Sequence, residues 1–267
     1  MKTSEELVLK TRFCNFKTEE VYLMKNINHS SAAFCMQPQL FPSTHGQRQK
    51  PDVLRRIKDP GSAITHGIGF VLSFIAAIPL ISLAIHSGDI RKVIAMSVFS
   101  LSMMALYAAS TCYHAFHGSE KAQTLRKKID HMMIFVLIAG SYTPVCMLTL
   151  WEGIGKVLLA LVWGIAAAGM ILKLFWVYCP KWVSSVLYIG MGWVCILAFP
   201  QLWNNLSAAQ FGWLLAGGII YTIGGVIYAL KLSIFNDRHP CFGSHEIFHL
   251  FVMGGSLCHF IVMFLLV

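Results

Sequence analysis

The sequence predicts an all-α integral membrane protein: a bundle of seven transmembrane helices with a cytoplasmic N-terminus and the C-terminus outside. Hydrophobic residues make up 56% of the 267 residues and charged residues only 12%, whereas a soluble domain carries about 25% charged residues. Six of the twelve acidic residues precede residue 60. The chain beyond that point is therefore too apolar for a soluble domain, and we expect it to lie in a membrane.

The first segment, residues 1–60, differs in composition from the rest. It is polar, contains ten Lys and Arg, and is interrupted by Pro42, Pro51 and Pro60. It has no apolar run long enough for the core of a signal peptide. We therefore expect a mostly disordered basic cytoplasmic tail over residues 1–60, followed by a seven-helix transmembrane domain over residues 61–267.

Seven later segments have the roughly 20 apolar residues that a membrane span requires. They are residues 64–85, 93–115, 131–150, 157–177, 184–202, 211–231 and 245–267. Their short connections make successive spans antiparallel. Because Lys and Arg favour cytoplasmic loops, the orientation follows from their distribution: a cytoplasmic N-terminus puts 18 of the 21 inside. We expect a multi-pass protein of the plasma (inner) membrane, although the same features also fit an endomembrane.

The net charge of +9 does not indicate nucleic-acid binding. No basic run is interleaved with aromatic residues, and basic inner loops account for the excess charge. We predict no nucleic-acid partner. The eight cysteines show no C-x-x-C spacing, so we also predict no structural disulfide.

Five polar residues lie at the ends of predicted spans that face the cytoplasm. Ser110 and His114 end the second span, Asp130 begins the third, and His245 and His249 begin the seventh. Residues four apart share one face of a helix. Polar groups within spans are costly and usually functional. The predicted topology therefore allows all five side chains to meet at one depth.

Three imidazoles and a water make a catalytic zinc site with an open position, and nitrogen ligands favour zinc over calcium or magnesium. Such a zinc ion lowers the pKa of its water to about 7. We predict Zn²⁺ held by His114, His245 and His249. Asp130 would act as general base or orient a ligand, and Ser110 would donate a hydrogen bond to the site or to a substrate carbonyl.

Each residue also has an ordinary structural interpretation. A histidine pair can cap a helix, a lone Asp can favour a helix N-terminus, and a Ser in a span often bonds its own backbone. Their convergence at one depth favours the metal site. The remaining histidines fit it less well: His259 lies about 21 Å along the helix from His245, His66 is expected to pack, and His117 and His131 are expected to be solvated at the interface.

The stretch His245-Glu246-x-x-His249 also matches the zincin peptidase signature, in which Glu246 would be the general base. The longer metzincin form fails, because its Gly and third His would fall on Val252 and Gly255. A membrane peptidase is therefore a weaker alternative.

The full set of motifs resembles the hemolysin III branch of the progestin and adipoQ receptor family over about residues 55–267. The motifs are Thr65-His66-Gly67-x-Gly69, Ser110-x-x-x-His114, Asp130-His131, the segment 137–144 and the segment 244–251. The resemblance implies a zinc ion on His114, His245 and His249 near the cytoplasmic leaflet, with Asp130 contacting it through water. Membrane ceramidases of the wider superfamily imply hydrolysis of a lipid amide, and the family name implies cytolytic activity.

We therefore predict a zinc-dependent hydrolase of a lipid amide or ester, with membrane lipid and zinc as partners. The alternatives are a pore-forming cytolysin and a ligand-sensing receptor with structural zinc. No span carries a polar stripe along one face, which argues against a pore within one chain. The sequence does not define an oligomeric state.

Overall fold

The computed structural model of the protein describes residues 57–230 and 243–267. These residues contain seven helices long and apolar enough to cross a membrane and no strand, which confirms the predicted fold class. The expected disordered tail lies outside the described residues, except for its last four positions.

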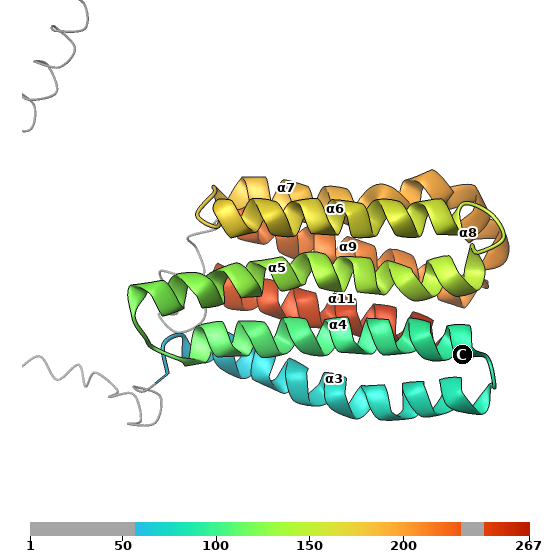
Figure 1. Ribbon diagram of the computed structural model, residues 1–267, viewed down its shortest axis with the longest axis horizontal. Helices are drawn as coiled ribbons and strands as arrows, with labels where there is room; N and C mark the ends of the chain where they lie inside the picture. The colour runs from blue at the N-terminus through green and yellow to red at the C-terminus, as the bar shows by residue number, and fades with distance from the viewer. Residues whose placement is uncertain (1–56, 231–242) are drawn as a thin grey trace, which may run out of the picture. The chain divides into compact units, whose positions relative to one another are not determined.

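The helices follow one another through short connections (Figure 1). The first two are α3 (Pro60–His86) and α4 (Ile90–Ala115). The third, α5 (Glu120–Pro144), continues as the π-helical segment η1 (Val145–Thr149). Next come α6 (Gly155–Phe175) and α7 (Lys181–Gly192), which continues as the 3₁₀ segment η2 (Trp193–Ala198) and α8 (Phe199–Asn205). The last two are α9 (Ala208–Leu230) and α11 (Ser244–Leu266).

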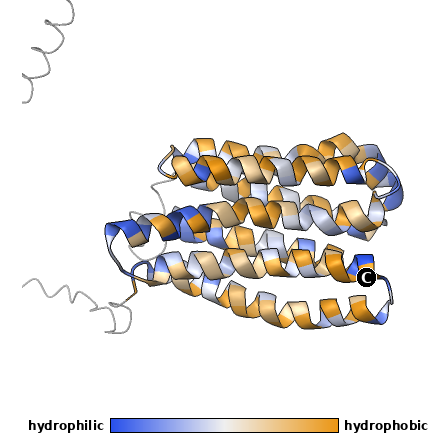
Figure 2. Ribbon diagram, viewed as in Figure 1, coloured by the Kyte–Doolittle hydropathy of each residue, from blue (hydrophilic) through white to orange (hydrophobic). Residues whose placement is uncertain are grey.

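Helix α5 begins at Glu120, well before the start that hydropathy predicts at residue 131. Ser119 caps it, since its hydroxyl accepts a hydrogen bond from the backbone N–H of Ala122 at 3.4 Å, as serine commonly does at this position. The added turns are hydrophilic, and Figure 2 shows them as a polar extension at one end of the bundle. Capping rather than hydropathy therefore sets where this helix begins.

The fifth span is not one continuous α-helix, because it changes to a 3₁₀ segment after Gly192. Pro200 lacks a backbone N–H and crowds the carbonyl four residues earlier, so a regular helix cannot run through this stretch. The hydroxyl of Tyr142 on α5 donates to the Gly192 carbonyl at 2.6 Å and accepts from the Cys195 N–H at 2.8 Å. The backbone groups released by the break are thus satisfied inside the bundle, as the membrane interior requires.

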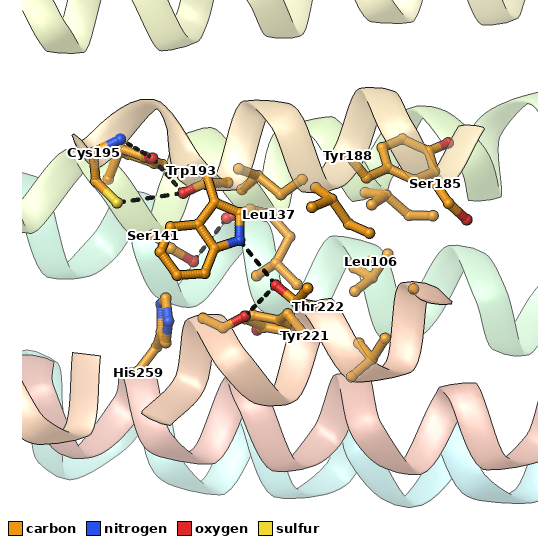
Figure 3. A pocket seen from close by; sticks show the side chains of 18 of the residues that line it. Leu106, Leu137, Ser141, Ser185, Tyr188, Trp193, Cys195, Tyr221, Thr222 and His259 are labelled. Atoms are coloured by element: carbon orange, nitrogen blue, oxygen red, sulfur yellow. Dashed lines mark hydrogen bonds between the residues drawn. The ribbon is translucent and has the colours of Figure 1, made fainter. Parts of the chain in front are cut away.

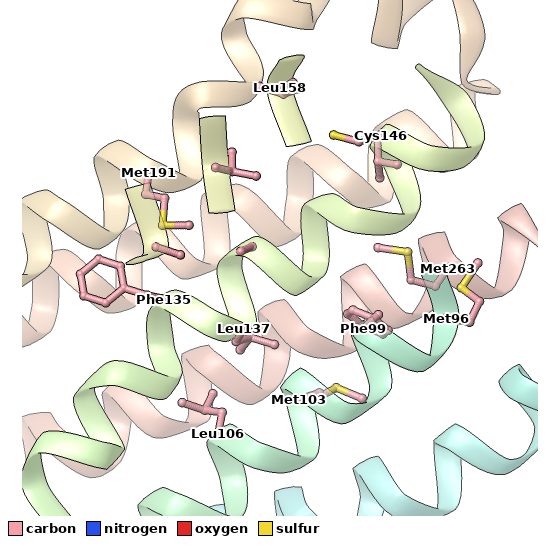
Figure 4. Close-up of a cluster of buried hydrophobic side chains, with 14 of the residues drawn as sticks. Met96, Phe99, Met103, Leu106, Phe135, Leu137, Cys146, Leu158, Met191 and Met263 are labelled. Carbon is pink, nitrogen blue, oxygen red and sulfur yellow. The ribbon is translucent and has the colours of Figure 1, made fainter. Parts of the chain in front are cut away.

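The helices pack as a closed ring in which α3 contacts α4, α4 contacts α5, α5 contacts α7, α7 contacts α9, α9 contacts α11, and α11 returns to α3. Helix α6 packs mainly on α5, outside this ring. Buried side chains between the helices form one apolar core (Figure 4) that includes Met96, Phe99, Met103, Phe135, Met191 and Met263. The ring places the end of α4 and the starts of α3, α5 and α11 at one end of the bundle.

Candidate metal site

Three histidines converge at that end of the bundle. His114 lies in the last turn of α4, and His245 and His249 lie in the first two turns of α11. One ligand nitrogen from each lies within 4.8 Å of the other two. The Nε2 atoms of His245 and His114 are 3.1 Å apart. The structure therefore brings together the three side chains that the sequence predicts as metal ligands.

Two of these rings are held through their other nitrogen. His114 donates from Nδ1 to Oδ2 of Asp59 at 3.0 Å, and Nδ1 of His249 lies 3.3 Å from Oγ1 of Thr65. A carboxylate on the far nitrogen fixes the tautomer and orientation of a histidine ligand. Asp59 thereby leaves Nε2 of His114 as the nitrogen that can bind a metal ion.

Asp59 is a residue that the sequence interpretation missed, because it was assigned to the tail. It directly precedes α3, and its backbone N–H donates to the carbonyl of His114 at 2.9 Å. The hydrogen bond from His114 is the main cause that holds the pKa of Asp59 below its ordinary 3.8, and Lys58, whose Nζ is 3.3 Å from Oδ2, acts in the same direction. The sequence does carry a signal for Asp59, because it is an acid at the start of a span and at the predicted cytoplasmic face.

The residues present fit a zinc ion. In the buried site the facing Nε2 atoms of His114 and His245 must either share one proton or bind one cation. The donor set consists of imidazole nitrogens alone, which suits zinc. Three protein ligands would leave one position on a zinc ion for water, as a catalytic zinc site requires.

Asp130 and Ser110 lie beside the cluster on neighbouring helices. Both are buried, with exposures of 6% for Asp130 and 1% for Ser110. Oδ2 of Asp130 is also 3.0 Å from Nδ1 of His131, whose side chain is only 12% exposed. The expectation that His131 is solvated is therefore wrong, because its imidazole is largely buried against the Asp130 carboxylate.

His66 and His259 lie outside the set of possible ligands. His66 is 3% exposed, and its ring stacks on that of His249 with centroids 3.6 Å apart. It supports the position of that ring by packing. His259 lies deeper along α11, and among the described residues neither of its ring nitrogens has a hydrogen-bond partner.

Glu246 points to the start of its own helix. Its Oε1 accepts from the Ser62 hydroxyl at 2.7 Å, and its Oε2 accepts from the backbone N–H of Gly243 at 2.8 Å. Both carboxylate oxygens are thus used to cap α11 and to join it to α3. This arrangement gives Glu246 a structural role and offers no support for the peptidase alternative.

A cavity of about 240 Å³ opens beside the histidines and extends along the inside of the bundle. Ser110, Asp130, His245 and His249 line one end, and Phe199, Leu202 and Phe211 lie among the lining residues contributed by α8 and α9. Its walls are predominantly apolar, and Figure 3 shows Leu106, Leu137, Tyr188 and Tyr221 around it. Such a shape suits a long apolar group whose polar end reaches the histidines.

The fold and this site define a multi-pass integral membrane protein with a buried cluster able to hold a metal ion. A family model described as "Haemolysin-III related" matches residues 54–260, and the chain belongs to this family. The predicted resemblance is thereby confirmed.

The chain is similar to two bacterial proteins and, more distantly, to an animal protein. The chain is 42% identical to "Hemolysin-3" of Bacillus cereus over 199 residues, which are 74% of this chain and 87% of that protein. It is 38% identical to "Hemolysin-3 homolog" of Bacillus subtilis (strain 168), over 74% of this chain and 89% of that protein. A more distant relative is "Adiponectin receptor protein" of Drosophila melanogaster, 24% identical over 78% of this chain and 50% of that protein.

Proposed function

We propose that this protein is a zinc-dependent hydrolase that cleaves an amide or ester bond of a membrane lipid. The observation that carries the proposal is that His245 and His249, which cluster with His114, line one end of a long, apolar cavity inside the bundle. A lipid in the plasma (inner) membrane would place its acyl chain in the cavity and its carbonyl beside His114, His245 and His249.

Zinc bound by these histidines would supply an activated water at neutral pH and polarise the substrate carbonyl. Asp130 would accept the proton from the attacking water and return it to the leaving group. Ser110, which lines the same cavity, would donate a hydrogen bond to the carbonyl oxygen as negative charge develops there. Asp59 holds the ring of His114 in place throughout.

The walls of the cavity explain why the substrate should be a lipid. They carry few groups that could form hydrogen bonds to a polar substrate in place of water. Burying the polar groups of such a substrate without partners would be costly. An acyl chain requires no such replacement. Asp130, His245 and His249 line one end of the cavity, which is where a scissile carbonyl would lie.

The name Hemolysin-3 of the Bacillus relatives supports one alternative, a cytolysin that acts by forming a pore. A pore requires a continuous polar path, whereas the cavity of this chain is mainly apolar. A pore would therefore have to form between several copies. A receptor with structural zinc is the other alternative, and it would bind a ligand in the cavity without turnover.

Reconstitution in liposomes separates these functions. The vesicles contain a ceramide, a matched acyl ester and an encapsulated dye, and mass spectrometry measures the released fatty acid. We expect the wild type to release fatty acid, and the rate of release to fall at least about 100-fold in His249→Ala and in Asp130→Asn. The control Ser87→Ala, at an exposed helix end, should leave the rate unchanged. Dye leakage that persists in His249→Ala, without fatty-acid release by any variant, would contradict the hydrolase and favour the pore.

A further inference from the structure

A second cluster of reactive side chains lies where α6 connects to α7, apart from the histidine site. Lys173 belongs to the last turn of α6, Cys179 to the connection, and Ser184 to the first turn of α7. Nζ of Lys173 is 2.9 Å from Sγ of Cys179 and 2.6 Å from Oγ of Ser184, and Sγ and Oγ are 3.3 Å apart. The three polar atoms thus form a closed triangle.

The triangle is shielded from solvent. The exposed fractions are 0% for Lys173, 9% for Cys179 and 3% for Ser184. A buried ammonium group is costly unless an anion accompanies it. The charge of Lys173 therefore requires a partner within its immediate surroundings.

Cys179 is the group that can supply the negative charge. Among the described residues, Nζ of Lys173 contacts the thiol, the Ser184 hydroxyl and, at 5.8 Å, the ring of Tyr188, and no carboxylate lies within ion-pair distance. Transfer of the thiol proton to Lys173 yields a thiolate–ammonium pair in which each buried charge compensates the other.

The charged and polar groups around the triangle also favour the thiolate–ammonium pair. Lys127 on α5, Tyr188 on α7 and Tyr228 on α9 are within electrostatic range of Cys179, and of these only Lys127 bears a charge at neutral pH. Burial raises the pKa of the Cys179 thiol, but the hydrogen bonds from Lys173 and Ser184 outweigh it and hold that pKa below its ordinary 9.0.

We propose that Cys179 is a thiolate modification site whose substrates are small hydroperoxides, at the predicted cytoplasmic face of the protein. The thiolate is the nucleophilic form of cysteine. Its sulfur attacks one oxygen of the peroxide, an S–O bond forms as the O–O bond breaks, and the departing hydroxide takes a proton from the Lys173 ammonium to become water. The sulfur is oxidised to a sulfenic acid, and the peroxide is reduced.

Burial determines which reagents can reach this thiolate. Trp176 and Tyr178 on either side of the connection are 49% and 65% exposed, while the Cys179 side chain turns inward. Hydrogen peroxide and iodoacetamide are small enough to enter after slight movement of the connection, and a bulky maleimide is not. The site should therefore favour small reagents over large ones.

The test is the rate of Cys179 modification by iodoacetamide as a function of pH, measured by mass spectrometry on the full-length protein. Free glutathione, measured under the same conditions, is the control thiol. We expect the rate at Cys179 to reach its plateau at a lower pH than the rate for glutathione. In Lys173→Met the plateau should shift to higher pH, with a rate at pH 7 about fivefold lower, because a more basic thiolate is scarcer but intrinsically more nucleophilic. Lys173→Arg should restore the wild-type profile.

Hydrogen peroxide followed by dimedone tests the oxidation step. We expect a dimedone adduct on Cys179 of the wild type and Lys173→Arg, and at least about fivefold less in Lys173→Met. If Cys179 of the wild-type protein and glutathione have the same pH profile, the proposal is overturned. Equal dimedone labelling of wild type and Lys173→Met would overturn it as well.

Discussion

Replacing Asp59 by Asn tests whether this carboxylate holds a metal ligand in position. The substitution keeps the size of the side chain but removes its charge, so the contact from Nδ1 of His114, now 3.0 Å long, becomes a weaker neutral one. Loss of such a supporting carboxylate costs about 10–100-fold in metal affinity. Because the Asp59 side chain is 42% exposed, water can replace part of its effect, and we expect about tenfold, or about 1.4 kcal/mol.

The assay is competition for zinc between the detergent-purified protein and a fluorescent chelator. Asp89→Asn is the matched control, because Asp89 also precedes a helix and accepts the N–H of Arg91 at 2.8 Å, but at the opposite end of the bundle from the histidines. Unchanged zinc affinity in Asp59→Asn, or an equal loss in Asp89→Asn, would refute a supporting role for Asp59.

Three further substitutions test other parts of the structure. Gly140→Ala would place a methyl group against the side chain of Ser102. The thermal midpoint of unfolding should therefore fall by the equivalent of about 1–3 kcal/mol. Gly164 has open space around it, so the control Gly164→Ala should not lower the midpoint. Ile138→Trp narrows the cavity and should reduce hydrolysis of long-chain lipids more than that of short-chain lipids; an equal reduction would argue against an acyl chain in the cavity. In Glu246→Gln the amide oxygen can still accept from the Gly243 N–H, and the amide NH2 can donate to the Ser62 hydroxyl. Lipid hydrolysis should therefore stay within about threefold, while a loss of 100-fold or more would restore Glu246 as a catalytic base.

The seven spans and the three histidines could be predicted from the sequence because both depend on simple constraints. Membrane thickness sets the length of an apolar helix, and the distribution of Lys and Arg predicts which helix ends share a face. His114 and His249 are far apart in sequence but lie at ends that this topology assigns to one face. Their close approach needed no knowledge of side-chain packing.

Features that depend on caps and tertiary contacts could not be predicted in the same way. The start of α5 depends on Ser119, and hydropathy alone placed it eleven residues too late. The contact between His131 and Asp130 depends on side-chain orientation, which hydropathy does not report. The contact between Asp59 and His114, and that between Lys173 and Cys179, arise only when separate helix ends and connections fold against each other.

The central claim is that His114, His245 and His249 hold a zinc ion, and metal analysis of the purified protein tests it most directly. We predict about one zinc ion per chain in the wild type and in His86→Ala, which alters an exposed histidine far from the cluster. The double variant His114→Ala/His249→Ala should contain no zinc above background. A wild-type protein free of zinc, or a double variant with undiminished zinc, would contradict the account.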